Sequence, residues 1–313
     1  AQQVLLLLAH LRFNPGAVLL LDEPDAHLEI LRQRSVYTLL TDAARETGAQ
    51  IVAASHSEVV LNEAADKDVV IAFVGRPHRI DDRSAQVLKA LREIGFEHYY
   101  QAERKGRVLY LEGATDLAIL QAWARRLGHP AAELLAEPFV EFVGNNYKRA
   151  LSHFFGLREA KPDLVAFALF DRLEPGRLMP VDFSIPHHVW TRREIENYLA
   201  LPAVLVRHAE GEEPDDLVGR PMRERRGEAM RKAIAQVEHG FRLMRRDPWS
   251  PEVKSSEELL PPIFATYHEL LGVPDKTNKG DFHVLASLML ADEIAPEVAA
   301  VLDALQRTLS RSE

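Results

Sequence analysis

Hydrophobic and polar positions in the first third of the chain alternate between short apolar runs and longer amphipathic stretches. The short runs are rich in Val, Leu, Ile and Ala, a composition typical of parallel strands buried on both faces. The longer stretches repeat apolar residues at helical spacing, and one of them ends at Gly48, a residue typical of a helix C-terminus. This alternation predicts part of an α/β domain. The predicted elements are helices over residues 1–13 and 29–48, strands over 17–22, 50–55 and 69–74, and an irregular polar segment over 78–100.

A second α/β pattern begins at Arg107 and predicts a parallel, four-stranded, Rossmann-like sheet flanked by helices. After Arg193 the spacing of apolar residues becomes helical, which predicts a C-terminal helical region. We therefore expect three parts, over residues 1–104, 105–192 and 193–313. The predicted strands lie over 108–113, 139–144, 164–171 and 187–191, and the predicted helices over 115–127, 147–157, 193–199, 256–271 and 281–308.

The composition is typical of a globular protein and excludes several other classes. Of the 313 residues, 47% are hydrophobic and 27% are charged. No apolar run approaches the roughly 18 residues that a membrane span needs. The absence of cysteine excludes disulfides, thiolate metal sites and a cysteine nucleophile, and it fits a reducing compartment. We therefore expect a cytoplasmic protein with no membrane partner.

The net charge of −9 argues against a general coat for nucleic acid, but the charge is unevenly distributed. Residues 220–246 contain nine basic and three acidic side chains, and this local surplus of six positive charges attracts a phosphate backbone. A solvated amphipathic helix is the alternative interpretation, because arginine is also a good helix former. The arginines that we predict to bind DNA are Arg223, Arg226, Arg231 and Arg245.

The stretch LLLDEPDAHLE, residues 19–29, has the features of a nucleotide-hydrolysing site. Asp22 lies at the predicted C-terminal end of a strand, where it can hold Mg²⁺, and the adjacent Glu23 can polarise an attacking water. His56, in the sequence ASHS, follows the next predicted strand, where an imidazole can sense a terminal phosphate. The three residues together predict the hydrolytic half of an ATPase.

These motifs resemble the Walker B, D-loop and H-loop part of ABC-type ATPase heads of the SMC/RecF-like branch. The resemblance implies that Asp22 binds magnesium, Glu23 is the catalytic base and His56 is the switch histidine, with ATP and Mg²⁺ as ligands and a homodimer formed through this portion. The phosphate-binding loop G-x-x-x-x-G-K-[ST] is missing from the sequence, so we expect it to precede Ala1 in a longer protein. The alternative is a degenerate ATPase half that serves as a scaffold.

A second group of carboxylates follows the strands of the predicted second sheet. Glu112 ends one strand, Gly113 allows a sharp turn after it, and Asp116 lies in the first turn of the next helix, where a capping role is the alternative. Asp171 ends a later strand and comes to lie beside Glu112 if the two strands are neighbours. Converging carboxylates form an all-oxygen site suited to one or two Mg²⁺ or Mn²⁺ ions.

The spacing Glu-Gly-x-x-Asp, followed by a strand ending in Asp, resembles the Toprim domain of topoisomerases, primases and certain nucleases. In that family the glutamate and an Asp-x-Asp pair hold divalent metals for phosphodiester chemistry. Glu112 matches the glutamate and Asp171 the first Asp of the pair, whereas Leu173 replaces the second Asp. Glu174, one position later, can substitute for it if the loop shifts.

An ABC-type head followed directly by a Toprim domain resembles the OLD (overcoming lysogenization defect) family of ATP-dependent nucleases. In TRREIENYLA, Glu194 and Glu196 look like additional metal carboxylates of that family, although they lie about 200° apart on a regular helix and both reach the site only if the segment begins irregularly. Glu194 is the favoured ligand of the two. In NKGDFHVLASLML, Lys279 resembles the lysine that stabilises charge on the scissile phosphate. Lys276 is the competing candidate, with an ordinary surface lysine as the further alternative.

The predicted function is metal-dependent DNA endonuclease or nickase activity coupled to an ABC-type ATPase, with a role in phage defence or DNA processing implied by the resemblance. Glu112, Asp171 and Lys279 are the predicted catalytic residues for cutting, and Glu23 for ATP hydrolysis. The expected partners are double-stranded DNA, ATP and a helicase. The alternative is an SMC/RecF-like DNA-binding ATPase whose Toprim domain is non-catalytic and serves assembly. A strand-rejoining or primer-making Toprim enzyme is the third interpretation, but its accessory modules are not visible.

Overall fold

The computed structural model describes most of the chain, and every structural statement below concerns those residues. They are residues 2–26, 28–64, 67–73, 77–79, 94–172, 183–211, 216 and 219–310. The chain divides into two compact units. The first comprises residues 1–106 and 155–163, and the second comprises residues 107–154 and 164–313.

The first unit is built around two parallel strands, β1 (Val18–Asp22) and β2 (Gln50–Ala54). The helices α1 (Gln2–Phe13) and α2 (Ile30–Thr47) form a small core with one face of this sheet, in which Leu19 is buried. The chain therefore has the predicted order of helix, strand, helix and strand, and α2 ends at Gly48 in the left-handed conformation.

The expectation that both faces of these strands are buried is wrong for the described residues. Leu20 is 78% exposed, and Val18 and Val52 are also exposed. Successive side chains of a strand point to opposite faces, so Leu19 and Leu20 point to opposite sides of the sheet. The helices α1 and α2 cover only the Leu19 side.

The rest of the first unit corrects two predictions. The strand predicted over residues 69–74 is limited to β3 (Ile71–Ala72), which pairs with β4 (His78–Arg79) in an antiparallel manner, and residues 74–76 lie outside the described part. The segment 78–100, predicted to be irregular, contains the start of helix α5 (Phe96–Lys105). This helix buries Tyr99 and Ala102 and ends at Gly106 in the left-handed conformation. A short helix, α3 (Glu58–Ala64), follows β2.

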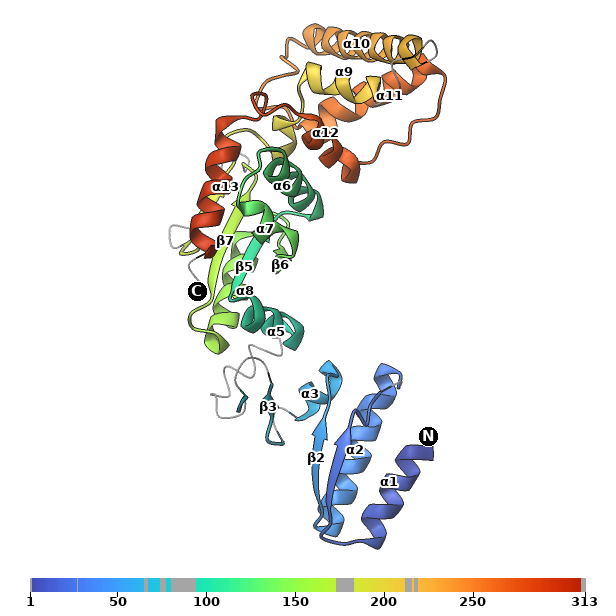
Figure 1. Ribbon diagram of the computed structural model, residues 1–313, viewed down its shortest axis with the longest axis vertical. Coiled ribbons are helices and arrows are strands. Elements are labelled where there is room, and N and C mark those ends of the chain that lie inside the picture. Colours follow the sequence, from blue (N-terminus) through green and yellow to red (C-terminus); the bar gives the residue numbers. More distant parts are fainter. Residues whose placement is uncertain are drawn as a thin grey trace. The chain divides into compact units, whose positions relative to one another are not determined.

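The second unit contains the predicted four-stranded parallel sheet, so the α/β fold class is confirmed. Its strand order is β6-β5-β7-β8, and all three pairings are parallel. The central strands β5 and β7 are direct neighbours, with Leu109 opposite Phe167. Figure 1 shows these strands in green beside the helices that cover them. The strands are β5 (Arg107–Leu111), β6 (Val140–Phe142), β7 (Val165–Phe170) and β8 (His187–Val189).

Helices cover both faces of this sheet. On one face Leu109 and Phe167 join a large core with α6 (Ala114–Arg126) and α13 (Pro296–Leu309). On the other face Phe170 packs edge-on against Tyr147 of α8 (Tyr147–Ala160), with ring centroids 4.3 Å apart. Burial on both faces explains why these strands are almost continuously apolar in the sequence. A further short helix, α7 (Ala131–Ala136), precedes β6.

The C-terminal region is helical as predicted, with different boundaries. In place of the helix predicted over 193–199 there is a 3₁₀ turn, η1 (Ile195–Tyr198). The helix predicted over 256–271 begins with a π-helical turn, η2 (Ser255–Leu259). The helix predicted over 281–308 is divided in two: one helix ends at Leu288, and the next begins at Pro296, in the first helical position that proline favours. The remaining elements are α9 (Pro202–Glu210), α10 (Gly219–Leu243), α11 (Leu260–Leu271), η3 (Lys279–Phe282) and α12 (His283–Leu288).

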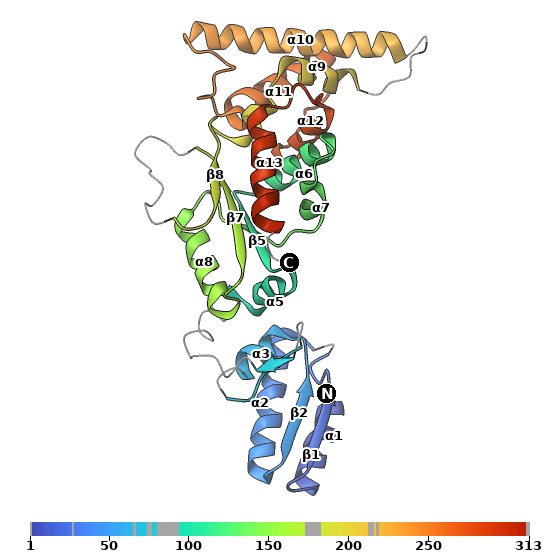
Figure 2. The ribbon, with the colours of Figure 1, turned by 60° about the vertical axis from the view of Figure 1, so that its left-hand side comes forward.

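The basic stretch predicted from the charge pattern forms the long helix α10. Figure 2 shows it as the longest helix, with α9 and α11 packed beside it. Within the described residues, no helix combines the length and apolar character that a membrane crossing requires.

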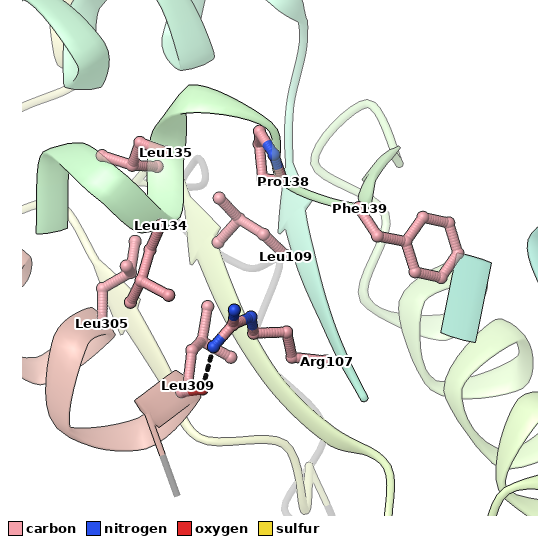
Figure 3. Close-up of a pocket in the computed structure, with 8 residues that line it drawn as sticks. All are labelled: Arg107, Leu109, Leu134, Leu135, Pro138, Phe139, Leu305 and Leu309. Carbon is pink, nitrogen blue, oxygen red and sulfur yellow. Dashed lines mark hydrogen bonds between the residues drawn. The ribbon is translucent and has the colours of Figure 1, made fainter. Parts of the chain in front are cut away.

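A small apolar cavity lies where α13 packs against the sheet (Figure 3). Its volume is about 10 Å³, which is about the space of a single water molecule, so it is no substrate site. At its edge Arg107 donates a hydrogen bond of 3.0 Å to the carbonyl oxygen of Leu309. The lining residues are Arg107, Leu109, Leu134, Leu135, Pro138, Phe139, Leu305 and Leu309.

Candidate functional site

Two carboxyl groups meet at the C-terminal ends of the central strands β5 and β7. Glu112 follows β5 directly and Asp171 follows β7, and the parallel pairing of these strands brings the two residues side by side. Burial raises the pKa of Asp171 to about 10, with further contributions from the charges of Glu112 and Asp116 and from a hydrogen bond with Glu112. The expectation that the two strands are neighbours is therefore confirmed.

Asp116 joins this pair from the first turn of α6. Its Oδ2 accepts a hydrogen bond of 3.2 Å from the main-chain N–H of Glu112, which turns the carboxyl group back toward the end of β5. Burial first, and then the negative charges of Glu196 and Glu112, together raise its pKa to about 7. This bond is made to a main-chain N–H that precedes the helix and is no side-chain cap of α6, whereas the charges of Glu196 and Glu112 act on Asp116, which lies in the carboxyl group cluster.

Glu194 and Glu196 approach Asp171 from the turn that follows β8. Glu194 has an extended backbone and precedes the 3₁₀ turn η1, so the segment begins irregularly, as both residues require. The main-chain N–H of Ile195 donates to Asp171 Oδ1 at 3.2 Å, which fixes this turn against β7. Oxygen atoms of Asp171, Glu194 and Glu196 all lie within 4.8 Å of one another.

The two glutamates have different surroundings, although both are buried. Burial raises the pKa of Glu196 to about 7, with the charge of Glu194 as the next cause. Burial also raises the pKa of Glu194, but hydrogen bonds from the main chain and side chain of Ser256 oppose this shift. Glu196 is also a cause of the raised pKa values of Asp116 and Asp171, whereas Glu194 is not among their main causes.

Lys279 is the lysine that reaches the carboxyl groups. Its Nζ lies 3.4 Å from Glu196 Oε1 and donates a hydrogen bond of 3.2 Å to Ser256 Oγ. Lys276 is exposed, and among the described contacts none joins it to these carboxyl groups. His283 forms a 2.9 Å hydrogen bond between its Nδ1 and the Gly280 carbonyl oxygen at the start of α12, which is a local helix contact.

Two residues of this region were not found from the sequence. Ser256 lies in η2 and binds Glu194, and no local pattern indicates this because the two residues are far apart in the chain. Asn145 follows β6 with a positive φ of 57°, and its Nδ2 donates to the Asp171 carbonyl oxygen at 3.4 Å. The sequence Gly-Asn-Asn at the end of a predicted strand is the signal that indicates such a turn. Glu174 and Leu173, considered for the second metal position, lie outside the described residues.

The donor set fits a hard divalent cation. Every clustered side chain other than Lys279 offers carboxylate oxygen, the ligand that Mg²⁺ and Mn²⁺ prefer. Several buried carboxyl groups with raised pKa values repel one another when ionised, and a bound cation removes that cost.

The candidate ATPase residues lie together in the first unit. Asp22 is the last residue of β1, as predicted, and Glu23 follows with a positive φ of 45°. The main-chain N–H of Glu23 donates to the Ala54 carbonyl oxygen at 2.9 Å, which places the end of β2 beside it. His56 Nδ1 lies 3.1 Å from Glu23 Oε1, and both side chains are exposed. His27, in the same motif, lies outside the described residues.

The arginines predicted to bind DNA lie on or directly after α10. Several basic side chains of this stretch are paired with acidic neighbours, among them Arg231 with Glu210 at 2.9 Å and Lys232 with Glu228 at 2.7 Å. Such pairs are typical of a solvated amphipathic helix, the alternative interpretation. Arg223 and Arg226 are half-buried on α10, whereas Arg245 is exposed beyond its end and has a positive φ of 55°.

Comparison with known protein families gives a match over the N-terminal part of the chain. A family model described as "AAA domain, putative AbiEii toxin, Type IV TA system" matches residues 2–62. No curated protein matches the chain. The matched residues include Asp22, Glu23 and His56, so the match supports the ATPase-type start of the chain that these residues predict.

Proposed function

We propose that this chain is part of an ATP-coupled, metal-dependent DNA endonuclease that nicks or cuts double-stranded DNA. The observation that carries the proposal is the cluster of the half-buried Glu112, Asp116 and Asp171 with the buried Glu196, beside Lys279, at the C-terminal ends of β5 and β7. Open α/β sheets bind their ligands at that edge. The family-model match over residues 2–62 supports the ATPase part.

In this proposal Glu112, Asp116, Asp171, Glu194 and Glu196 hold one or two Mg²⁺ or Mn²⁺ ions. When bound, such ions activate a water molecule and polarise the phosphodiester. Lys279, beside Glu196, is placed to offset negative charge on the scissile phosphate. Asn145 holds the loop after β6 against the main chain of Asp171.

The remaining residues are assigned to binding and control. Arg223, Arg226, Arg231 and Arg245 bind the DNA backbone without reading its sequence. Asp22, Glu23 and His56 act on ATP in the complete head, whose binding or hydrolysis controls access to DNA. A homodimer through residues 1–104 and a helicase partner stay predictions.

The test uses supercoiled plasmid with Mg²⁺ or Mn²⁺ and no ATP. We expect conversion to the nicked form, and its loss by at least about 100-fold in Glu112→Ala, because a metal ligand is removed. Glu133→Ala is the matched control, since Glu133 is an exposed acid on α7 in the same unit. Equal nicking by wild type and Glu112→Ala indicates a contaminating nuclease and contradicts the assignment. No cutting with either metal supports the non-catalytic, DNA-binding ATPase instead.

A further inference from the structure

Ser256 is the residue that links the acidic and basic halves of the candidate site. Its main-chain N–H and its hydroxyl both donate to the Glu194 carboxylate, the hydroxyl at 3.0 Å from Oε2. The same hydroxyl oxygen accepts a hydrogen bond of 3.2 Å from Lys279 Nζ. A serine hydroxyl has one donor and two acceptor positions, so it can serve a carboxylate and an ammonium group at once.

The surrounding chain fixes Ser256 in this position. It is 4% exposed and lies in the π-helical turn η2, a rare geometry that is frequent at functional sites. Just before it, the carbonyl oxygen of Val253 accepts a hydrogen bond of 2.8 Å from Asn197 Nδ2, and that of Pro251 accepts one of 2.8 Å from the N–H of Arg193. These bonds attach the segment before η2 to the turn that carries Glu194 and Glu196.

Lys279 has two contacts of opposite consequence. The contact with Glu196 neutralises a carboxylate that the proposed metal needs, so this ion pair competes with the cation. The contact with Ser256 does not involve any of the carboxylates assigned to the metal. Without the Ser256 contact, Glu196 would be the partner that holds the Lys279 ammonium group. An entering cation would then have to displace the lysine from Glu196 before it could bind there.

We propose that Ser256 is a positioning residue that holds Lys279 at the edge of the acidic site, so that a divalent cation can take Glu196 while the lysine stays directed at the phosphate. The role of Lys279 toward the phosphate rests on the proposed nuclease function. The role of Ser256 in cation binding does not depend on that function. Both carboxylate oxygens of Glu194 accept hydrogen bonds from Ser256, so Glu194 anchors this serine in addition to its place in the acidic site.

Mn²⁺ alone is the probe for the first test, by calorimetric titration of the whole chain. Lys279→Met removes the competing charge and is expected to tighten Mn²⁺ binding about fivefold or more. Ser256→Ala leaves Lys279 on Glu196 and is expected to weaken Mn²⁺ binding about fivefold. In the double variant the effect of Ser256→Ala should vanish to within about twofold, because residues that act through one another are non-additive. An undiminished effect of Ser256→Ala in the Lys279→Met background overturns the proposal.

Ser255→Ala is the matched control, since Ser255 is the buried neighbour in the same turn, whereas the Glu194 carboxylate accepts its hydrogen bonds from Ser256. It should bind Mn²⁺ as wild type does. Ser256→Thr retains the hydroxyl and should restore most of the binding lost in Ser256→Ala. If Ser255→Ala weakens binding as much as Ser256→Ala, the effect comes from disturbing η2, and the proposal is wrong.

Plasmid nicking gives the second readout. Ser256→Ala should lower kcat about 10- to 100-fold while the KM for plasmid stays within about twofold, because a misplaced lysine affects the reacting phosphate more than the rest of the DNA. A rise in KM with unchanged kcat contradicts the positioning role. If the wild-type chain does not nick DNA at all, the proposed nuclease function fails, whereas the Mn²⁺ titration still decides the role of Ser256.

Discussion

Replacing Asp116 by asparagine should stabilise the metal-free protein, and more so as the pH rises. Asp116 lies half-buried beside Glu196 and Glu112, and its pKa is raised from 3.8 to about 7. Asparagine has the same shape and keeps an oxygen that can accept the Glu112 N–H, but it carries no charge. The substitution therefore removes the electrostatic cost and leaves the packing largely unchanged.

The pH dependence follows from the direction of this shift. Between pH 3.8 and about 7 the unfolded chain has lost the Asp116 proton and the folded chain still holds it. The folded state then binds more protons, so the free energy of unfolding of the wild type falls as the pH rises through this window and levels off above it. The full shift corresponds to about 4 kcal/mol as an upper limit. Because neighbouring carboxyl groups share the charge, we expect about 1–3 kcal/mol of added stability in Asp116→Asn between pH 5 and pH 8.

Urea unfolding in EDTA at pH 5 and pH 8 measures this difference. The stability gain of Asp116→Asn should be small at pH 5 and grow toward pH 8, while its response to added Mn²⁺ should be weaker than that of the wild type. A variant that is less stable than the wild type at pH 8, or one whose gain is independent of pH, refutes the account of a strained, ionised cluster.

Three further predictions concern other parts of the second unit. Glu297→Gln should lower the free energy of unfolding by about 1–3 kcal/mol at pH 7, because Glu297 accepts hydrogen bonds from Thr191 and Tyr198 and its pKa is lowered. This loss of stability should shrink as the pH falls below 4.5, and urea unfolding at pH 7 and below pH 4.5 tests it. Arg245→Gly should raise the melting temperature slightly, because it relieves about 0.5–1 kcal/mol of strain at a residue with positive φ. It should also weaken plasmid binding in low salt, and unchanged binding refutes a DNA contact of Arg245. Leu305→Ala should cost about 2–5 kcal/mol in chemical denaturation, because the side chain is fully buried between α13 and the sheet, and a smaller loss means that the cavity there collapses.

The sequence alone predicts the positions of residues that lie at the C-terminal ends of strands. Glu112 and Asp171 could be predicted as neighbours because parallel strands place their C-terminal ends at one edge of the sheet, and the apolar runs mark those ends. Asp22 at the end of β1 was predicted for the same reason. In each case a local pattern determines the position of the side chain.

Contacts between distant segments were not predictable in this way. The 3₁₀ turn at Ile195–Tyr198 brings both glutamates to Asp171, but a helical periodicity argument excludes one of them unless the turn is known. Ser256 reaches Glu194 only because hydrogen bonds attach its segment to that turn. Pro296 marks the start of α13, but the helical spacing of apolar residues continues on either side of it. The sequence therefore predicted one continuous helix over 281–308.

The bond between Arg107 and Leu309 has a consequence for the order in which the second unit is made. Arg107 begins the central strand β5, and Leu309 ends α13, which covers that strand through the shared core. During synthesis, β5 emerges about 200 residues before its covering helix does. The part of its apolar face that α13 covers stays open for that interval, roughly 10–40 s at ordinary elongation rates, although α6 on the same face follows β5 directly. The acidic site, which takes Glu196 and Lys279 from the helical region, is therefore complete only after that region has been synthesised.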